Sequence, residues 1–174
     1  KKILEELMEN AKQIRQEELE QFALNDSMTG MYNRNAYDYF VKNEKDFEGY
    51  VIVTFDLNNL KQCNDQYGHR AGDEYIINAA HIIEDNFERY GKCYRIGGDE
   101  FCCIIPKGRY FKIERVMHKI DQDVEILNHK NIIPVPVGIA YGYAVFTADD
   151  TDPEKVRERA DEDMYRNKKA MKQS

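Results

Sequence analysis

The chain has 174 residues, of which 42% are hydrophobic and 33% charged, and its formal net charge is −7. This length fits one compact domain with a short extension, and the apolar content supplies a core, so two ordinary domains or disorder throughout are excluded. The acidic balance argues against a nucleic-acid binder, and no apolar run approaches the roughly 20 residues of a membrane span. The four cysteines include no C-x-x-C pair, and we expect reduced thiols in the core.

Residues 1–24 are expected to form one helix. Its apolar positions follow the spacing of a coiled-coil seam: Leu4, Leu7, Ala11 and Ile14, then Leu19 and Phe22 after a slip. The rest of this segment is almost entirely charged or amide side chains. So narrow a stripe favours a partner helix, and the alternative is a helix docked on its own domain.

The remaining chain alternates helical and strand patterns around short turns. The expected elements are, in order, a turn at 25–33, a helix carrying Tyr37, Phe40 and Val41 on one side, a strand at 50–57, a short helix at 58–66, a helix at 73–89, strands at 92–96 and 101–105, a helix at 110–128, at least one strand within 135–146, and a helix from Pro153, capped by Asp152, to about Met171. Gly97 and Gly98, between the paired strands, are expected to supply the positive φ of a tight reversal. A hairpin in this order requires a sheet that is at least partly antiparallel.

Three acidic residues lie where two of the predicted strands end. Asp56 closes a strand rich in Val, Ile and Phe, and Asp99 and Glu100 lie at the tip of the hairpin. If the hairpin lies beside the first strand, Asp56 and Asp99 converge, and two carboxylates beside open backbone suit Mg²⁺. Taken singly, each has an ordinary alternative, a strand end for Asp56 and a solvated hairpin for the other two.

Asn64 and Asp73 flank a pair of glycines, Gly68 and Gly72. An amide and a carboxylate together can recognise a base edge that presents donors and acceptors, and guanine's N1–H and N2–H₂ suit the carboxylate. The alternative, which these residues alone favour, is helix capping, with Asp73 as the N-cap of the helix at 73–89 and Asn64 as a C-cap.

The last helix ends in a run of cations: Arg166, Lys168, Lys169 and Lys172. Compensation of the helix dipole is the ordinary explanation for any one of them. The functional alternative is a phosphate clamp, which Lys61 could join from the short helix at 58–66. An acidic protein that binds a nucleoside triphosphate needs such a local reversal of charge.

Four segments in this order resemble the GGDEF family of diguanylate cyclases, over about residues 26–172. They are DSMTGMYNR (26–34), FDLNNLKQCNDQYGHRAGD (55–73), the signature YRIGGDEF (94–101) and ADEDMYRNKKAMK (160–172). The resemblance implies an α+β fold with a central five-stranded, mostly antiparallel sheet surrounded by helices, similar to polymerase palms and nucleotidyl cyclases. It also implies that residues 25–174 form the catalytic domain and residues 1–24 a signalling helix.

The resemblance further implies condensation of two GTP molecules into cyclic di-GMP, with release of two pyrophosphates. By position, the implied roles are metal binding by Asp56, Asp99 and the carbonyl of Leu57; catalysis by Asp99 and Glu100; guanine recognition by Asn64 and Asp73; and contacts to the rest of GTP by Lys61, Gly98, Lys168 and Lys172. The implied cofactor is Mg²⁺ or Mn²⁺, two ions per GTP. A non-catalytic module of the same fold that binds GTP or a protein partner is the alternative function.

The implied partners are GTP and a second copy of the chain, facing the first across a two-fold axis and joined to it by the N-terminal helix. An upstream sensor domain is expected in a longer protein. We expect no nucleic-acid partner, no membrane contact by this segment and a cytoplasmic location, where GTP is found, although the full-length protein could be anchored to a membrane.

The chain departs from the family pattern at three places. Asn58 stands where many members have a second Asp, so weaker metal binding is expected, and Lys172 replaces Arg, which removes a bidentate fork. Glu88 and Gly91 occupy the positions of the family's R-x-x-D product-inhibition site. Neither residue can serve there, so feedback inhibition through that site is not expected.

Overall fold

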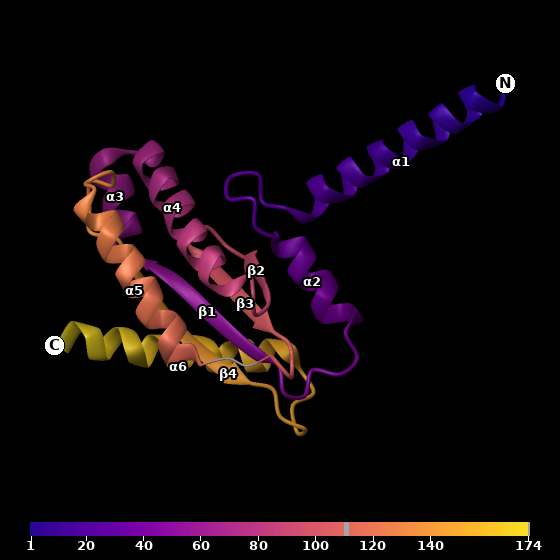
Figure 1. The fold of residues 1–174 in the computed structure, drawn as a ribbon. Coiled ribbons are helices and arrows are strands. Elements are labelled where there is room, and N and C mark those ends of the chain that lie inside the picture. The colour runs from indigo at the N-terminus through magenta and orange to yellow at the C-terminus, as the bar shows by residue number, and fades with distance from the viewer. Residues whose placement is uncertain (110–111, 174) are drawn as a thin grey trace.

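The computed structural model describes the backbone of residues 1–109 and 112–173, with side chains as far as Ala170 (Figure 1). The helices are α1 (Lys2–Leu24), α2 (Arg34–Asn43), α3 (Leu60–Tyr67), α4 (His69–Phe87), α5 (Ile113–His129) and α6 (Pro153–Gln173). The strands are β1 (Val51–Asn58), β2 (Lys92–Arg95), β3 (Glu100–Ile105) and β4 (Gly138–Val145). Their order confirms the α+β class.

The sheet is antiparallel throughout the described residues, in the order β2-β3-β1-β4. It therefore has four strands there, and the expected count of five is wrong. At the outer edge of β4, side chains of α6 bond to the backbone groups that a further strand would pair with. At the β2 edge, the pairing among the described residues is limited to an isolated bridge between Tyr32 and Tyr94.

Helices cover both faces of the sheet (Figure 1). Along β1, successive side chains alternate between the faces. Val53, Phe55 and Leu57 join a core with α3, α4 and α5, whereas Ile52 joins a second core with α2 and α6. Residues of β1 and its neighbours are thus fixed from both sides, and the end of β1 that carries Asp56 is held rigidly between them.

Helix α1 extends away from this domain (Figure 1), and none of its residues is buried. The predicted stripe is exposed along its length, with Leu4 at 63% and Phe22 at 81% exposure. The alternative of a helix docked on its own domain is therefore wrong. At 1.5 Å per residue the helix is about 34 Å long, with an uncovered apolar seam. Among the described residues, no helix combines the length and apolarity that a bilayer crossing requires.

Helix α4 begins earlier than expected, at His69, directly after Gly68 with its positive φ of 88°. Asp73 therefore lies inside the helix, and Gly68 rather than Asn64 caps α3. Both capping alternatives are wrong. The predicted cap at Asp152 is confirmed, because its carboxylate accepts a hydrogen bond from the Glu154 N–H at 3.0 Å.

Candidate functional site

The acidic residues converge at one end of the sheet, as expected. In the β1–β3 register Asp56 lies directly opposite Glu100, and Asp99 immediately precedes Glu100 in the hairpin turn. Partial burial, together with the nearby negative charge of Asp56, raises the pKa of Asp99 above its usual value. The two carboxylates are therefore close enough to repel each other.

The backbone of Leu57 is open toward this turn. Residues 141, 143 and 145 of β4 direct backbone groups outward to α6, so the even-numbered residues of β4 and of the paired β1 bond to each other. Because backbone groups alternate in direction along a strand, the N–H and C=O groups of the odd-numbered residues of β1 point toward β3. The β1–β3 pairing ends at Asp56, so the carbonyl of Leu57 points toward the turn that holds Asp99. The Leu57 side chain itself is buried in the core.

One of the three predicted cations meets the acidic cluster. The Lys168 ammonium of α6 forms an ion pair with Asp56, and both side chains are about three-quarters buried. Lys61 is exposed on the first turn of α3. The Lys172 side chain lies outside the described residues, although the α6 backbone continues to Gln173.

Asn64 and Asp73 lie on the neighbouring helices α3 and α4, which pack against each other. Gly72 is in contact with the Asn64 side chain, since a Cβ on Gly72 would lie 1.7 Å from Asn64 Oδ1. The backbone of α4 thus fixes this amide, and the next residue, Asp73, is exposed beside it. An acceptor and donor pair is available here, as base recognition requires.

Tyr75, which the sequence reasoning missed, ties this helix pair to the acidic cluster. Its buried hydroxyl donates to Asn58 O at 2.5 Å and accepts from the Gly138 N–H at 2.9 Å. The hydroxyl therefore bridges Asn58 and Gly138, the last residue pair between β1 and β4, two residues beyond Asp56. Only the type of residue, an aromatic with a polar tip on the buried stripe of α4, could have indicated it.

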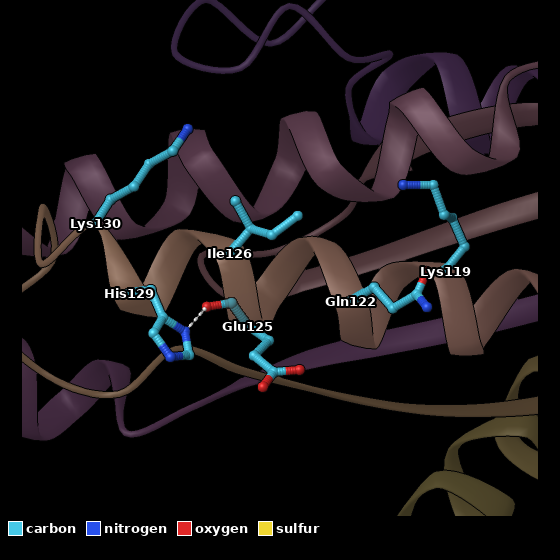
Figure 2. Close-up of a pocket in the computed structure, with 6 residues that line it drawn as sticks. All are labelled: Lys119, Gln122, Glu125, Ile126, His129 and Lys130. Carbon is cyan, nitrogen blue, oxygen red and sulfur yellow. Dashed lines mark hydrogen bonds between the residues drawn. The ribbon is translucent and has the colours of Figure 1, made fainter.

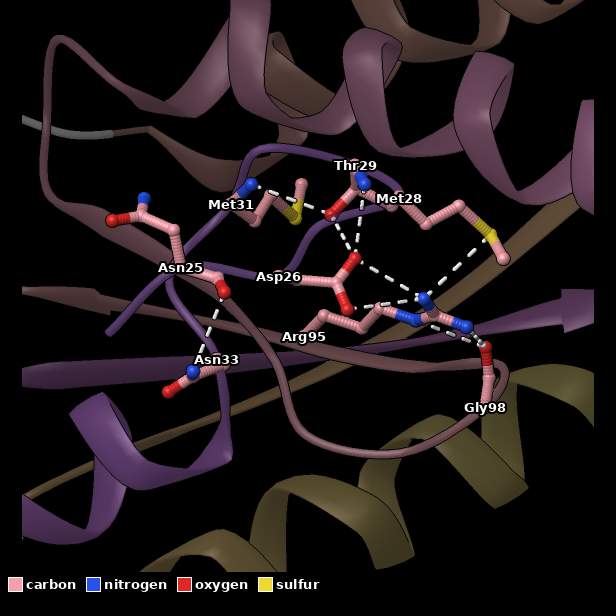
Figure 3. Close-up of polar contacts among 8 residues, drawn as sticks. All are labelled: Asn25, Asp26, Met28, Thr29, Met31, Asn33, Arg95 and Gly98. Carbon is pink, nitrogen blue, oxygen red and sulfur yellow. Dashed lines mark hydrogen bonds and ion pairs between the residues drawn. The ribbon is translucent and has the colours of Figure 1, made fainter. Parts of the chain in front are cut away.

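Arg95 lies within the signature YRIGGDEF, but no role was predicted for it. Figure 3 shows its guanidinium between the Asp26 carboxylate, at 3.1 Å and 3.2 Å, and the Gly98 carbonyl oxygen, which accepts two of its N–H groups at 3.0 Å and 3.3 Å. Asp26 in turn accepts from the N–H and hydroxyl of Thr29. The turn that follows α1 is therefore bonded directly to the tip of the hairpin.

The two glycines of this tip do not act as expected. Neither Gly97 nor Gly98 has a positive φ, so the reversal does not require that conformation. Gly97 instead lies against the Glu100 side chain, where a Cβ would come within 3.1 Å of Oε2. A Cβ on Gly98 would meet open space, so the backbone of Gly98 is accessible from outside.

The donor set fits a hard divalent cation. Asp56, Asp99 and Glu100 bring three negative charges to this end of the sheet, and Lys168 compensates one of them. Among the described residues no cluster of three or more His, Cys, Asp or Glu side chains surrounds a single point. Two carboxylates and a carbonyl nevertheless suit Mg²⁺, which fills its octahedron with water and substrate phosphate.

A hollow of about 620 Å³ lies elsewhere, on the outer face of α5 (Figure 2). All of its lining residues belong to this one helix or, for Lys130, to the cap that follows it, and the His129 Nδ1–H donates a hydrogen bond to Glu125 O at 2.8 Å. A shallow, mixed-charge face of a single helix is a solvated surface. The acidic end of the sheet is therefore the candidate site.

Comparison with known proteins agrees with this fold. Residues 23–174 match the family model described as diguanylate cyclase, GGDEF domain. The chain is 32% identical over 132 residues to the bifunctional diguanylate cyclase/cyclic di-GMP phosphodiesterase MucR of Pseudomonas aeruginosa, covering 71% of this chain and 19% of MucR. It is 29% identical over 158 residues to diguanylate cyclase DgcS of Shewanella oneidensis, covering 87% of this chain and 52% of DgcS. The chain thus spans about half or less of the length of these relatives.

Among solved structures, the coiled coil and GGDEF domain of DgcB from Caulobacter crescentus, in complex with c-di-GMP, resembles the chain with a TM-score of 0.76. The match covers 96% of this chain and 93% of the other at 23% sequence identity. This likeness concerns the fold, and it extends over α1 as well as the domain.

Proposed function

Since the chain belongs to the GGDEF-domain family of diguanylate cyclases, we propose that it condenses two GTP molecules into cyclic di-GMP with release of two pyrophosphates. The observation that carries the proposal is the convergence of Asp56 and Asp99 beside Lys168. Carboxylates for a metal and a cation for phosphate are the two requirements of phosphoryl transfer, in which a protein mainly positions groups and neutralises charge.

Each residue has a defined task in this proposal. Asn64 and Asp73 bind guanine, whose N1–H and N2–H₂ donate to the carboxylate, and adenine's N1 acceptor is repelled there. Lys61, Lys168 and Lys172 contact the β- and γ-phosphates, and the accessible backbone of Gly98 admits the nucleotide. Asp56, Asp99 and the Leu57 carbonyl would hold Mg²⁺ or Mn²⁺, two ions per GTP. When bound, such ions stabilise the charge on phosphate and acidify a coordinated hydroxyl.

The reaction couples two copies of the chain. One domain binds one GTP, so two domains face each other about a two-fold axis. The 3′-oxygen of one GTP attacks the α-phosphorus of the other in line with the departing pyrophosphate, and Asp99, assisted by Glu100, accepts the 3′-hydroxyl proton. The same step in the opposite direction closes the ring and releases the second pyrophosphate.

Residues 1–24 serve as a signalling helix in this proposal, and residues 25–174 as the catalytic domain. The exposed seam of α1 supports pairing with the α1 of a second copy. A coiled coil would raise the local concentration of one domain around the other, and an upstream sensor domain could change its register. Shortening the chain to residues 25–174 should therefore reduce activity most at low protein concentration. Equal activity of the two forms there would exclude this role for α1.

The test is incubation of the full chain with Mg²⁺ and GTP, ATP or their mixture, at several protein concentrations, followed by chromatography of the products. We expect cyclic di-GMP from GTP, with a rate that rises more steeply than linearly with protein concentration. Asp99→Asn should abolish the product.

GTP binding without product at any protein concentration would instead support the non-catalytic module. One observation favours that second candidate: Asn58 contributes an amide where many family members have a carboxylate. Restoring the acid with Asn58→Asp tests whether this position limits the reaction.

A further inference from the structure

The outer edge of β4 is covered by side chains of one helix. Three residues of α6, spaced four apart, bond to alternate backbone groups along this edge: Arg159 Nη2 donates to Val145 O at 3.0 Å, the Tyr143 N–H donates to Asp163 Oδ2 at 3.0 Å, and Asn167 Nδ2 donates to Tyr141 O at 2.9 Å. We call these three contacts the edge ladder. Exposed strand edges need such protection, but the ladder also fixes the helix along the strand.

The spacing of the ladder permits one register. Four residues of an α-helix rise about 6 Å, and two residues of an antiparallel strand span about 6.8 Å. The helix runs antiparallel to β4, so each step of four residues on α6 meets the next outward backbone group on the strand. Sliding α6 by one turn along β4 would leave one end of the ladder without its partner and mismatch the other side chains.

A close backbone contact reinforces this register. A Cβ on Gly142 would lie 2.1 Å from Met164 N and 2.3 Å from Ala160 O, so α6 approaches β4 most closely where β4 has no side chain. Ala140 and Ala144, on the same face of β4, are also small and buried. The helix is therefore seated on the strand as well as bonded to its edge.

The ladder ends at the candidate site. Lys168 follows Asn167 in α6, and Ala140, the residue before Tyr141 in β4, lies opposite Asp56 in the β1–β4 register. The last contact of the ladder is thus adjacent to the ion pair between Lys168 and Asp56.

We propose that Asp163 and Asn167 are positioning residues, which hold α6 in the register that brings Lys168 to Asp56 and to the phosphates of the bound nucleotide. The placement of Lys168 at Asp56 does not depend on the proposed function, whereas the consequence for phosphate binding rests on it.

The test compares the accessibility of Lys168 in the full chain by reductive methylation and peptide mass spectrometry, with Lys169 as the internal reference. Lys169 lies 4.6 Å from the centre of the Tyr165 ring and has no part in the ladder. Asp163→Ala and Asn167→Leu should each raise the methylation rate of Lys168 relative to Lys169 by about fivefold, the factor that corresponds to loss of one hydrogen bond.

Asp163→Asn is the matched control. It has the same charge as Asp163→Ala, and both lose the ion pair with Arg166, but its amide oxygen can still accept from the Tyr143 N–H. The relative rate for Lys168 in this variant should stay within about twofold of the parent. Unchanged relative rates in folded Asp163→Ala and Asn167→Leu would overturn the proposal. If Asp163→Ala does not fold, Asn167→Leu decides alone.

A second readout separates this inference from the proposed function. A non-hydrolysable GTP analogue should bind about fivefold more weakly to Asn167→Leu, whereas GMP, held mainly at the guanine, should bind equally well. Equal weakening for both ligands would refute a role in phosphate positioning. A chain that makes no cyclic dinucleotide but shows the methylation pattern would leave the positioning role intact and refute only the cyclase.

Discussion

Lys168 has two tasks that a single substitution should separate. Without nucleotide it neutralises Asp56, and with GTP bound its proposed partner is phosphate. Under the proposed function, the ammonium would therefore compete with a free metal ion for Asp56 but would assist binding of the metal–nucleotide complex. We predict that Lys168→Met increases the affinity for the metal alone and decreases the affinity for GTP.

The magnitude follows from the exposure of the pair. The side chains of Lys168 and Asp56 are 27% and 22% exposed, so the pair is neither a surface contact nor fully buried. An interaction of about 1 kcal/mol, the upper end for exposed pairs, corresponds to a factor of about five. We expect Mn²⁺ alone to bind about fivefold more tightly to the variant, and a non-hydrolysable GTP analogue about fivefold more weakly.

Free Mn²⁺ in a titration can be measured by electron paramagnetic resonance, and nucleotide binding by calorimetry. Lys169→Met is the control, because it removes the same charge one residue away, from a side chain that lies over the Tyr165 ring. It should change neither affinity by more than about twofold. If Mn²⁺ binds Lys168→Met no more tightly than the parent, the ion pair does not compete with the metal and the reasoning fails.

Three further predictions concern the supports of the site. Tyr75→Phe should lower the free energy of unfolding by about 1–2 kcal/mol. Burial raises the pKa of Tyr75 to about 12, so its hydroxyl stays protonated and chemical denaturation should show the same loss at pH 6 and pH 9. A loss that disappears at pH 9 would contradict a bridge through a protonated hydroxyl. Burial alone would raise the pKa of Asp26, but its hydrogen bonds from Thr29 and the charge of Arg95 lower it, so its contribution is present above the usual value of 3.8 and lost below it. The stability difference between Asp26→Asn and the parent should therefore shrink between pH 7 and pH 3, and a constant difference would exclude this linkage. Gly72→Ala should weaken GTP binding about tenfold by displacing the Asn64 amide, with little change in melting temperature, whereas unchanged binding would show that the amide does not contact the base.

Much of the fold could be predicted because its signals are local. The apolar periodicity of α5, the β-branched run of β1 and the Asp–Pro start of α6 each depend on residues that are neighbours in the chain. The convergence of Asp56 with Asp99 was also predicted, because one hairpin and one strand end determine it once they are paired. The predicted start of α4 was wrong because Gly68 and Gly72 resemble loop residues. Gly72 in fact lies within the helix, where the absence of a side chain accommodates Asn64.

The missed supports are polar side chains that each have a partner far away in the sequence. The Tyr75 hydroxyl bonds to the Asn58 carbonyl oxygen at the end of β1, and Arg95 bonds to the Asp26 carboxylate, nearly 70 residues earlier. The residue types alone do not identify such a partner, since any tyrosine or arginine can bond to a carbonyl or a carboxylate. Only the fold makes the partners specific.

The case of α6 shows what a sequence could still reveal. Arg159, Asp163 and Asn167 look like the solvated face of a charged helix, and the resemblance to a five-stranded family directs attention to a missing strand rather than to the helix. Yet β4 reads Gly-Ile-Ala-Tyr-Gly-Tyr-Ala-Val, with small residues at every second position. Such a strand face fits a helix backbone at close range, and a helix that close to an edge strand brings its polar flank to unpaired backbone groups. Small residues on one face of an edge strand, followed by polar residues at four-residue spacing on the next helix, together predict an edge ladder that neither pattern indicates alone.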